Sequence, residues 1–272
     1  MKLFDIFATI DRRIIYLTIG LVVAIPIILK LKMPIRISNE VKSAYQTIEN
    51  LPEGSVILAS IDYDATSAPE LTPMFRTFLR QCFRKKLRVI YTGHLAIGLP
   101  LAQFDLDMIT EECNAVYGED YINLGYRPGY TAVMIGMGRE IRDFFAVDYK
   151  GVPVDSFPIM KDVHNYNDIA LIVDFAHGYA AEYWIQYVVS RFGVTMFACV
   201  TGVMAPSLYP YLQAGQLTGI VGGLQGAAEY EILVGNPETA TFGMPAQSIA
   251  HIFILAFIIF GNIGYFVTRR KK

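Results

Sequence analysis

The chain has 272 residues, 53% of them hydrophobic, with a formal net charge of −2 at pH 7. Soluble domains usually carry about 45–50% apolar residues, so this composition indicates membrane segments. The near-neutral charge argues against nucleic-acid binding, which needs a basic patch and usually a high pI. The three cysteines form no CxxC pair, which argues against a disulfide framework and a zinc motif.

The first apolar segment, IIYLTIGLVVAIPIIL, runs without a charge from Ile14 to Leu29. It is shorter than the roughly 20 residues that cross a bilayer, but the flanking lysines can reach the interface. No small-residue cleavage site follows, which favours an uncleaved anchor over a signal peptide. We predict a terminal tail over residues 1–13 and a transmembrane helix over residues 14–32.

The last apolar segment, IAHIFILAFIIFGNIGYFV, runs from Ile249 to Val267 and is followed by a run of arginines and lysines. A long apolar stretch closed by basic residues is typical of a membrane span. We predict a transmembrane helix over residues 247–268 and a basic tail over residues 269–272.

Two polar residues lie inside this last segment, His251 and Asn262. Their spacing of 11 residues places them on roughly one helix face. Polar side chains in lipid usually face a partner helix, and Gly261 and Gly264 would allow close packing beside Asn262. We predict that Asn262, Gly261, Gly264 and His251 pack against another helix in the membrane, with an interfacial position as the alternative for His251. A homo- or hetero-oligomer formed through the membrane helices follows from this.

Two crossings place both termini on one side of the bilayer. The tails carry the basic residues Lys2, Arg12, Arg13, Arg269, Arg270, Lys271 and Lys272. The domain side carries fewer, all after the first helix: Lys30, Lys32, Arg36 and Lys42. The positive-inside rule therefore favours cytoplasmic termini and an extracytoplasmic domain.

Residues 33–246 are enough for one sizeable core. Six short apolar runs alternate there with helical segments: Val56–Tyr63, Leu87–Tyr91, Tyr121–Tyr126, Ile169–Phe175, Thr195–Val200 and Leu217–Val221. The helices are expected over Ile37–Leu51, Pro69–Arg84, Leu101–Val116, Thr131–Phe144, Ala180–Phe192 and from Leu224. Such alternation predicts a three-layer α/β fold with a mostly parallel sheet, Rossmann-like or flavodoxin-like, whose strand order stays open.

Ligands of open α/β sheets bind beyond the carboxyl ends of the strands. Five acidic or histidine residues fall there and are the candidate catalytic residues: Asp62, Asp64, His94, Asp174 and His177. Histidine and carboxylate together can run acid–base chemistry, because imidazole titrates near neutral pH and a carboxylate can orient it. The same residue types also collect at strand ends as turn and cap residues, and no metal site is predicted from their spacing.

Other residues at the same edge are candidate ligand-binding residues: Arg127, Thr201, Gly222 and Gly223. The glycines precede a helix, where free N–H groups attract anions. However, Val221 stands where a GxGxxG motif needs glycine, and no Walker A motif is present. Close helix–strand packing explains these glycines equally well, and GxSxG, HExxH and kinase signatures are missing too, so the cofactor stays unknown.

Four segments resemble an uncharacterised prokaryotic family of membrane proteins. They are Ser67–Leu71, Tyr117–Gly129, Gly222–Glu231 and Gln247–His251. The resemblance implies an α/β domain between N- and C-terminal transmembrane helices and carries no activity over.

Three functions remain open from the sequence. The first is a membrane-anchored binding or assembly module, a subunit of a larger membrane complex. The second is a hydrolase or transferase at the membrane surface that uses the Asp and His residues at the strand ends. The third is a small-ligand sensor that uses the same edge without turnover.

Overall fold

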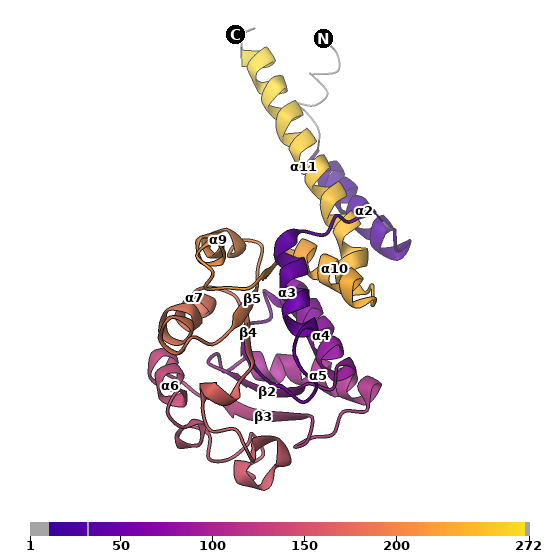
Figure 1. Ribbon diagram of the computed structural model, residues 1–272. Coiled ribbons are helices and arrows are strands. Elements are labelled where there is room, and N and C mark those ends of the chain that lie inside the picture. The colour runs from indigo at the N-terminus through magenta and orange to yellow at the C-terminus, as the bar shows by residue number, and fades with distance from the viewer. Residues whose placement is uncertain (1–10, 32, 270–272) are drawn as a thin grey trace. The chain divides into compact units, whose positions relative to one another are not determined.

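The structure, a computed structural model, describes residues 11–31 and 33–269 (Figure 1). The chain divides into two compact units: Ile35–Ala240, and the two ends together, Met1–Pro34 with Thr241–Lys272. The first unit is an α/β domain, and the second contains the apolar helices. Most of the predicted N-terminal tail and of the basic C-terminal tail lies outside the described residues.

The domain is built on a six-stranded parallel sheet. Its strands are β1 (Val56–Asp62), β2 (Arg88–Gly93), β3 (Tyr121–Tyr126), β4 (Leu171–Ala176), β5 (Met196–Val200) and β6 (Ile220–Gly222). Their order is β3-β2-β1-β4-β5-β6. This is the doubly wound order, in which the winding direction changes between β1 and β4. The predicted parallel α/β fold is therefore confirmed.

Helices cover both faces of the sheet (Figure 1). One face carries α3 (Asn39–Glu49), α4 (Ala68–Arg84), α5 (Gly98–Cys113) and α10 (Gly223–Val234). The other carries α6 (Tyr130–Met137), α7 (Ala180–Trp184) with α8 (Ser190–Phe192), and α9 (Ala205–Gln213). A π-helical segment, Ile185–Val189, joins α7 to α8.

Three helices differ from the sequence-based prediction. The helix expected over Thr131–Phe144 ends at Met137, and a 3-10 turn follows over Ile141–Asp143. The break falls at Gly138, where a Cβ would come 2.2 Å from the ring of Phe192, so the chain turns where only glycine fits. Ser38 is the N-cap residue of α3, but its hydroxyl donates to Glu229 instead of capping the helix. Helix α9 was not predicted, because its prolines obscure a helical pattern.

The central strand β1 is buried along its whole length, as expected for a sheet covered on both sides. On one face its neighbour Phe175 in β4 packs edge-on against Phe75 and Phe78 of α4, with ring centroids 5.2 and 5.3 Å apart. The other face carries Ser60 and Asp62. Strand alternation therefore sends two polar side chains into an otherwise apolar layer.

The second unit contains helices α2 (Arg12–Ile28) and α11 (Thr239–Arg269). Among the described helices, only α11 is long and apolar enough to cross a membrane. Helix α2 has 17 residues and ends short of the predicted limit, because Pro26 lies in its last turn and Lys30 turns the chain with a φ of 46°. The predicted N-terminal span therefore appears as a shorter apolar helix.

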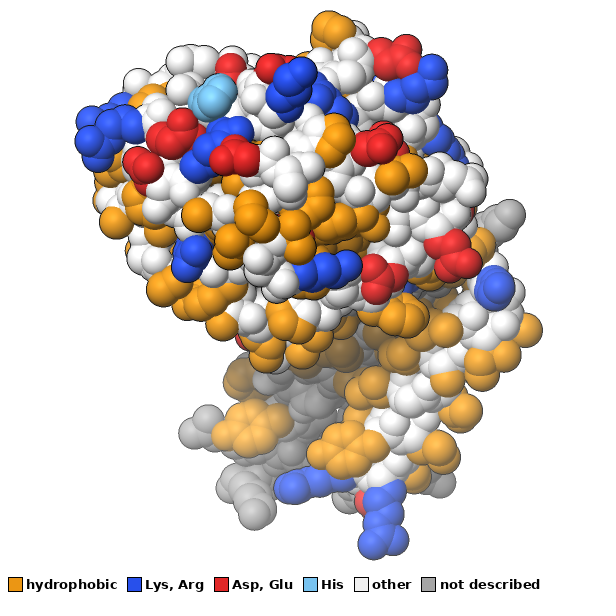
Figure 2. All heavy atoms as spheres, turned by 90° about the horizontal axis from the view of Figure 1, so that it is seen from below, with side chains coloured by type: hydrophobic (Ala, Val, Ile, Leu, Met, Phe, Trp, Pro, Cys, Tyr) orange, Lys and Arg blue, Asp and Glu red, His pale blue; other side chains and the backbone are white. Residues whose placement is uncertain are grey.

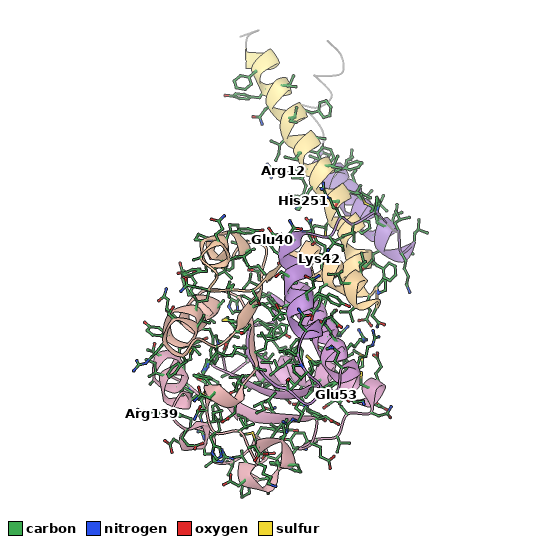
Figure 3. The ribbon with its side chains drawn as sticks, viewed as in Figure 1. Arg12, Glu40, Lys42, Glu53, Arg139 and His251 are labelled. Carbon is green, nitrogen blue, oxygen red and sulfur yellow. The ribbon has the colours of Figure 1, made fainter. Side chains whose placement is uncertain are left out.

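Polar residues of α11 can be placed within the helix. His251 lies exposed on it (Figure 3). The Asn262 amide donates to the carbonyl of Ile258 at 2.8 Å, one turn earlier. A Cβ at Gly261 would meet no atom within 4 Å. The helix backbone thus accepts one hydrogen bond from the Asn262 amide. The space beside Gly261 is unfilled, so a lipid or another helix could pack there.

Acidic and basic side chains are interspersed on the face of the domain seen in Figure 2. That face shows no large patch of one sign, as the net charge of −2 suggests.

Candidate functional site

The candidate site lies at the carboxyl edge of the sheet, around the point between β1 and β4 where the winding changes direction. Asp62 ends β1 and Asp174 lies in β4, where it pairs in register with Ser60. Asp62 and Asp174 therefore project from the same face of adjacent strands. Both are buried, with 1% and 0% of their surface exposed.

Asp62 bonds the two loops that follow the neighbouring strands β2 and β4. One carboxyl oxygen accepts from the backbone N–H of His94 at 2.7 Å, and the other accepts from the Ser60 hydroxyl at 2.5 Å. Its backbone carbonyl accepts from the backbone N–H of His177 at 3.2 Å. Asp62 therefore fixes the start of both the loop after β2 and the loop after β4.

The His94 ring is buried, with 3% of the residue exposed. Its Nδ1 lies 3.1 Å from the carbonyl oxygen of Arg127. A carbonyl only accepts, so Nδ1 carries the proton and Nε2 of the neutral ring is an acceptor. That Nε2 has no hydrogen-bond partner among the described residues.

His177 is held in the same way at the surface. Its Nδ1 lies 3.2 Å from the Asp62 carbonyl, which leaves Nε2 facing outward, 3.8 Å from a carboxyl oxygen of Asp64. Asp64 also accepts from the N–H and hydroxyl groups of Thr66 and Ser67. These bonds, led by the Thr66 hydroxyl, lower the pKa of Asp64 from 3.8 to about 2.

Asp174 is the unusual member of the site. Neither of its carboxyl oxygens has a hydrogen-bond partner among the described residues. Burial raises the pKa of Asp174 well above its ordinary value, and the charge of Asp62 and a side-chain contact with the Asp62 carboxyl raise this pKa further. An unpartnered carboxyl in the interior costs about 1–3 kcal/mol or more, and a function is one reason to keep it.

Aromatic side chains surround these groups. The His94 ring lies 5.1 Å from that of Tyr130 and 5.7 Å from that of Trp184, and Tyr183 lies 5.6 Å from Tyr130. The Trp184 indole N–H is a fourth buried polar atom without a partner among the described residues. Burial raises the pKa of the Tyr130 hydroxyl, and the charges of Asp62 and Asp174 raise this pKa further.

The five candidate catalytic residues are therefore brought together at one edge. Asp62, His94 and Asp174 form its buried part, whereas Asp64 and His177 form its exposed part. The spacing in sequence did not identify Tyr130 and Trp184, because both come from helices whose facing is set by packing. One signal for Trp184 was present, since it is the only tryptophan in the chain.

The candidate ligand-binding residues behave differently. The backbone of Arg127 contacts His94, but its guanidinium lies over the ring of Phe145 at 5.7 Å. Thr201 begins the turn before α9, where its carbonyl accepts from the N–H groups of Met204 and Ala205. Neither side chain is seen to join the buried cluster.

The glycines before α10 form a close backbone crossing. A Cβ on Gly223 would lie 3.0 Å from the Cα of Gly202, and Glu70 accepts from the Gly202 N–H at 2.8 Å. The Glu70 carboxylate therefore lies beside the first residue of α10, where a second anion would be repelled. The packing explanation of these glycines is favoured over phosphate binding.

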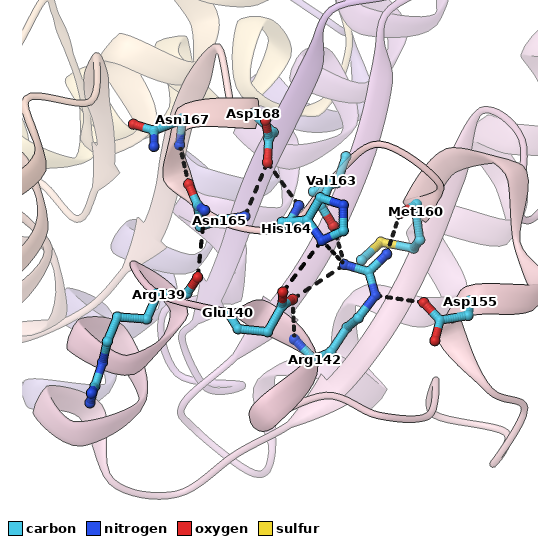
Figure 4. A network of polar contacts seen from close by, with 10 residues as sticks. All are labelled: Arg139, Glu140, Arg142, Asp155, Met160, Val163, His164, Asn165, Asn167 and Asp168. Atoms are coloured by element: carbon cyan, nitrogen blue, oxygen red, sulfur yellow. Dashed lines mark hydrogen bonds and ion pairs between the residues drawn. The ribbon is translucent and has the colours of Figure 1, made fainter.

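The stretch before β4 is a series of 3-10 turns that Arg142 holds together (Figure 4). Its guanidinium bonds Asp155, Glu140 and the carbonyls of Met160 and Val163. Every nitrogen of the Arg142 guanidinium makes at least one of these bonds, which indicates a structural role.

A cavity of about 360 Å³ opens at the same edge, between the start of α5 and the end of β3. It is lined mainly by Leu99, Pro100, Tyr126 and Tyr149, with the amides of Gln103 and Asn123. These amides bond each other and their neighbours, so the cavity suits an apolar group. No group of three or more His, Cys, Asp or Glu side chains suited to a metal ion occurs in the part of the chain that the structure describes.

Comparison with known proteins gives no match, neither to a family model, nor to a curated protein, nor to a solved structure.

Proposed function

We propose that this chain is a membrane-anchored α/β protein that binds a small polar ligand at the carboxyl edge of its sheet, between β1 and β4. One observation carries the proposal: four buried polar atoms without partners gather there, the two carboxyl oxygens of Asp174, His94 Nε2 and Trp184 Nε1. Buried polar groups are otherwise almost always hydrogen-bonded. A bound ligand, with or without ordered water, would supply the missing partners.

A second candidate function is acid–base catalysis at the same place, as a hydrolase or transferase. The observation in its favour is the contrast between two adjacent carboxyls. Burial raises the pKa of Asp174 well above its ordinary value, whereas the Asp62 carboxyl accepts two hydrogen bonds. Such a difference between neighbouring acids is what separates a general acid from a base. His177 adds an outward-facing Nε2 at the entrance to the site.

The membrane attachment is part of the proposal. The length and composition of α11 support one span. We propose that α2 supplies a second, with its flanking lysines at the interface, and that the termini are cytoplasmic and the domain extracytoplasmic. Assembly of several copies, or of this chain with another subunit, through the face of Asn262 remains the proposed role of α11.

The ligand-binding proposal is tested by what the protein carries when purified. Wild-type chain and the variant Asp174→Asn would be extracted in mild detergent, heated, and the released small molecules compared by mass spectrometry. The variant Glu119→Gln, which neutralises an exposed carboxyl near the start of β3, is the matched control. We expect a compound in the wild-type and control samples that the Asp174 variant lacks. Identical extracts from all three, with no compound at a stoichiometry near one, would count against a ligand at this edge.

A further inference from the structure

We propose that the ligand of this site is a small organic cation, a protonated amine. The inference rests on the proposed ligand site and specifies its chemistry. Three features of the site support it: the charge, the aromatic rings and the buried polar atoms without partners.

The charge of the site is negative and uncompensated. In the described chain, no lysine or arginine side chain bonds Asp62, Asp64 or Asp174. Arg127, which follows β3 at the same edge, is engaged with the ring of Phe145. An anion entering here would meet like charges in a setting of low dielectric, whereas a cation would relieve them.

The aromatic rings around His94 suit a cation as well. The rings of Tyr130 and Trp184 lie 5.1 and 5.7 Å from the His94 ring, and the Tyr183 ring lies 5.6 Å from that of Tyr130. The faces of tyrosine and tryptophan attract ammonium groups within about 6 Å, the more so when water is excluded. Trp184 is fully buried, so water is excluded on its side of the site.

The unpaired atoms point to a hydrogen-bond donor. Three of the four, both oxygens of Asp174 and Nε2 of His94, can accept, and an ammonium group is a donor only. A metal ion would need a denser set of ligands than the described residues offer. The fourth atom, Trp184 Nε1, needs an acceptor, which a hydroxyl on the ligand or an ordered water would provide.

A protonated amine could reach a membrane-anchored protein either as a free metabolite or as a lipid headgroup. The shared chemistry is the ammonium group. Free ethanolamine on one side, and nanodiscs with phosphatidylethanolamine against phosphatidylglycerol on the other, separate the two sources.

The test is thermal unfolding of the full chain in mild detergent with three probes of matched size: ethanolamine as the cation, ethylene glycol as the neutral compound, and glycolate as the anion. Methylamine and putrescine extend the cation set. We expect a saturable rise of about 5 °C with at least one amine, the shift that near-saturating binding gives for a domain of this size. The shift should fall by more than half in Asp174→Asn and persist in Glu119→Gln.

The outcomes of this test distinguish a failure of the amine proposal from a failure of the ligand-binding proposal. A saturable, Asp174-dependent shift with ethylene glycol or glycolate, and none with the amines, overturns the amine and leaves the ligand site standing. The absence of a shift with every probe overturns the amine, whereas matching extracts from wild type and the Asp174 variant would count against the ligand site as well. A response to phosphatidylethanolamine nanodiscs alone assigns the amine to a lipid.

Discussion

Asp62 and Asp174 show how neighbouring residues of one type acquire different roles. Asp62 ends β1 and accepts from Ser60 and from the His94 backbone, so it builds the site. Asp174 faces the same layer from β4 and has no partner among the described residues. The first carboxyl stabilises the folded chain, and the second is retained at a cost in stability.

Replacing Asp62 should therefore destabilise the domain. The variant Asp62→Ala leaves the buried N–H of His94 without an acceptor, and we expect a loss of about 1–3 kcal/mol in the free energy of unfolding. Denaturant unfolding of the detergent-solubilised chain measures it. The control Ser60→Ala removes one bond and should cost less, about 1 kcal/mol. An Asp62 variant as stable as wild type would contradict the organising role.

The pH dependence of stability should reveal Asp64. Its pKa in the folded protein, about 2, lies below the ordinary 3.8, so its contribution is present above pH 3.8 and is lost as the pH falls toward 2. We expect the variant Asp64→Asn to show a smaller decline in stability over that range than wild type. Equilibrium unfolding at several pH values between 5 and 2 gives both slopes, and equal slopes would mean that the Thr66 and Ser67 contacts do not hold the carboxylate in solution.

At the scale of elements, α4 holds the segment that leads from the domain to α11. Arg80, with 3% of its side chain exposed, bonds both Glu112 of α5 and Glu238. Glu231 of α10 accepts from the N–H groups of Glu238 and Ala240. The last residues of the domain, 238–240, are thus held to α4 and α10 by the Arg80 guanidinium and the Glu231 carboxylate.

The variant Arg80→Met tests this fastening. It removes a forked ion pair while keeping the apolar stem, and we expect a loss of about 1–3 kcal/mol together with faster amide exchange in residues 234–240. The control Arg84→Met removes exposed bonds to Val234 and Asn236 and should cost less than about 1 kcal/mol. Equal losses of unfolding free energy in the two variants would show that the buried ion pairs of Arg80 stabilise the domain no more than the exposed bonds of Arg84.

The elements also show what a sequence can and cannot predict. All six strands were predicted, because each is a short apolar run bounded by turn residues, as in Tyr121–Tyr126. The clustering of Asp62, His94, Asp174 and His177 followed from parallel strands sharing one edge. Tyr130 and Trp184 were missed, because the way a crossover helix faces the sheet depends on packing between distant segments. The missing partners of Asp174 were equally out of reach, since a partner is a matter of three-dimensional distance.

At the scale of the whole molecule, the question is how many times the chain crosses the membrane. Helix α11 has the length for one crossing, whereas α2 has 17 residues. If both span, removing residues 247–272 alone leaves the protein resistant to carbonate extraction, and so does removing residues 1–32 alone. Only the double truncation should release it. Release after the first truncation would mean that α2 does not anchor the chain.

The account depends on Asp174 being kept for binding at the expense of stability. Thermal unfolding of ligand-free wild type and of Asp174→Leu, both full-length in the same detergent at pH 7, tells whether Asp174 stabilises or destabilises the fold. Leucine has a similar branched shape and needs no partner. Because burial raises the pKa of Asp174, this carboxyl lowers the free energy of unfolding at every pH above 3.8. We predict that Asp174→Leu unfolds at a higher temperature, with a gain of about 1–4 kcal/mol, and no longer responds to the ligand. A variant that unfolds at a lower temperature would show that Asp174 stabilises the fold, and would contradict a binding site at this edge.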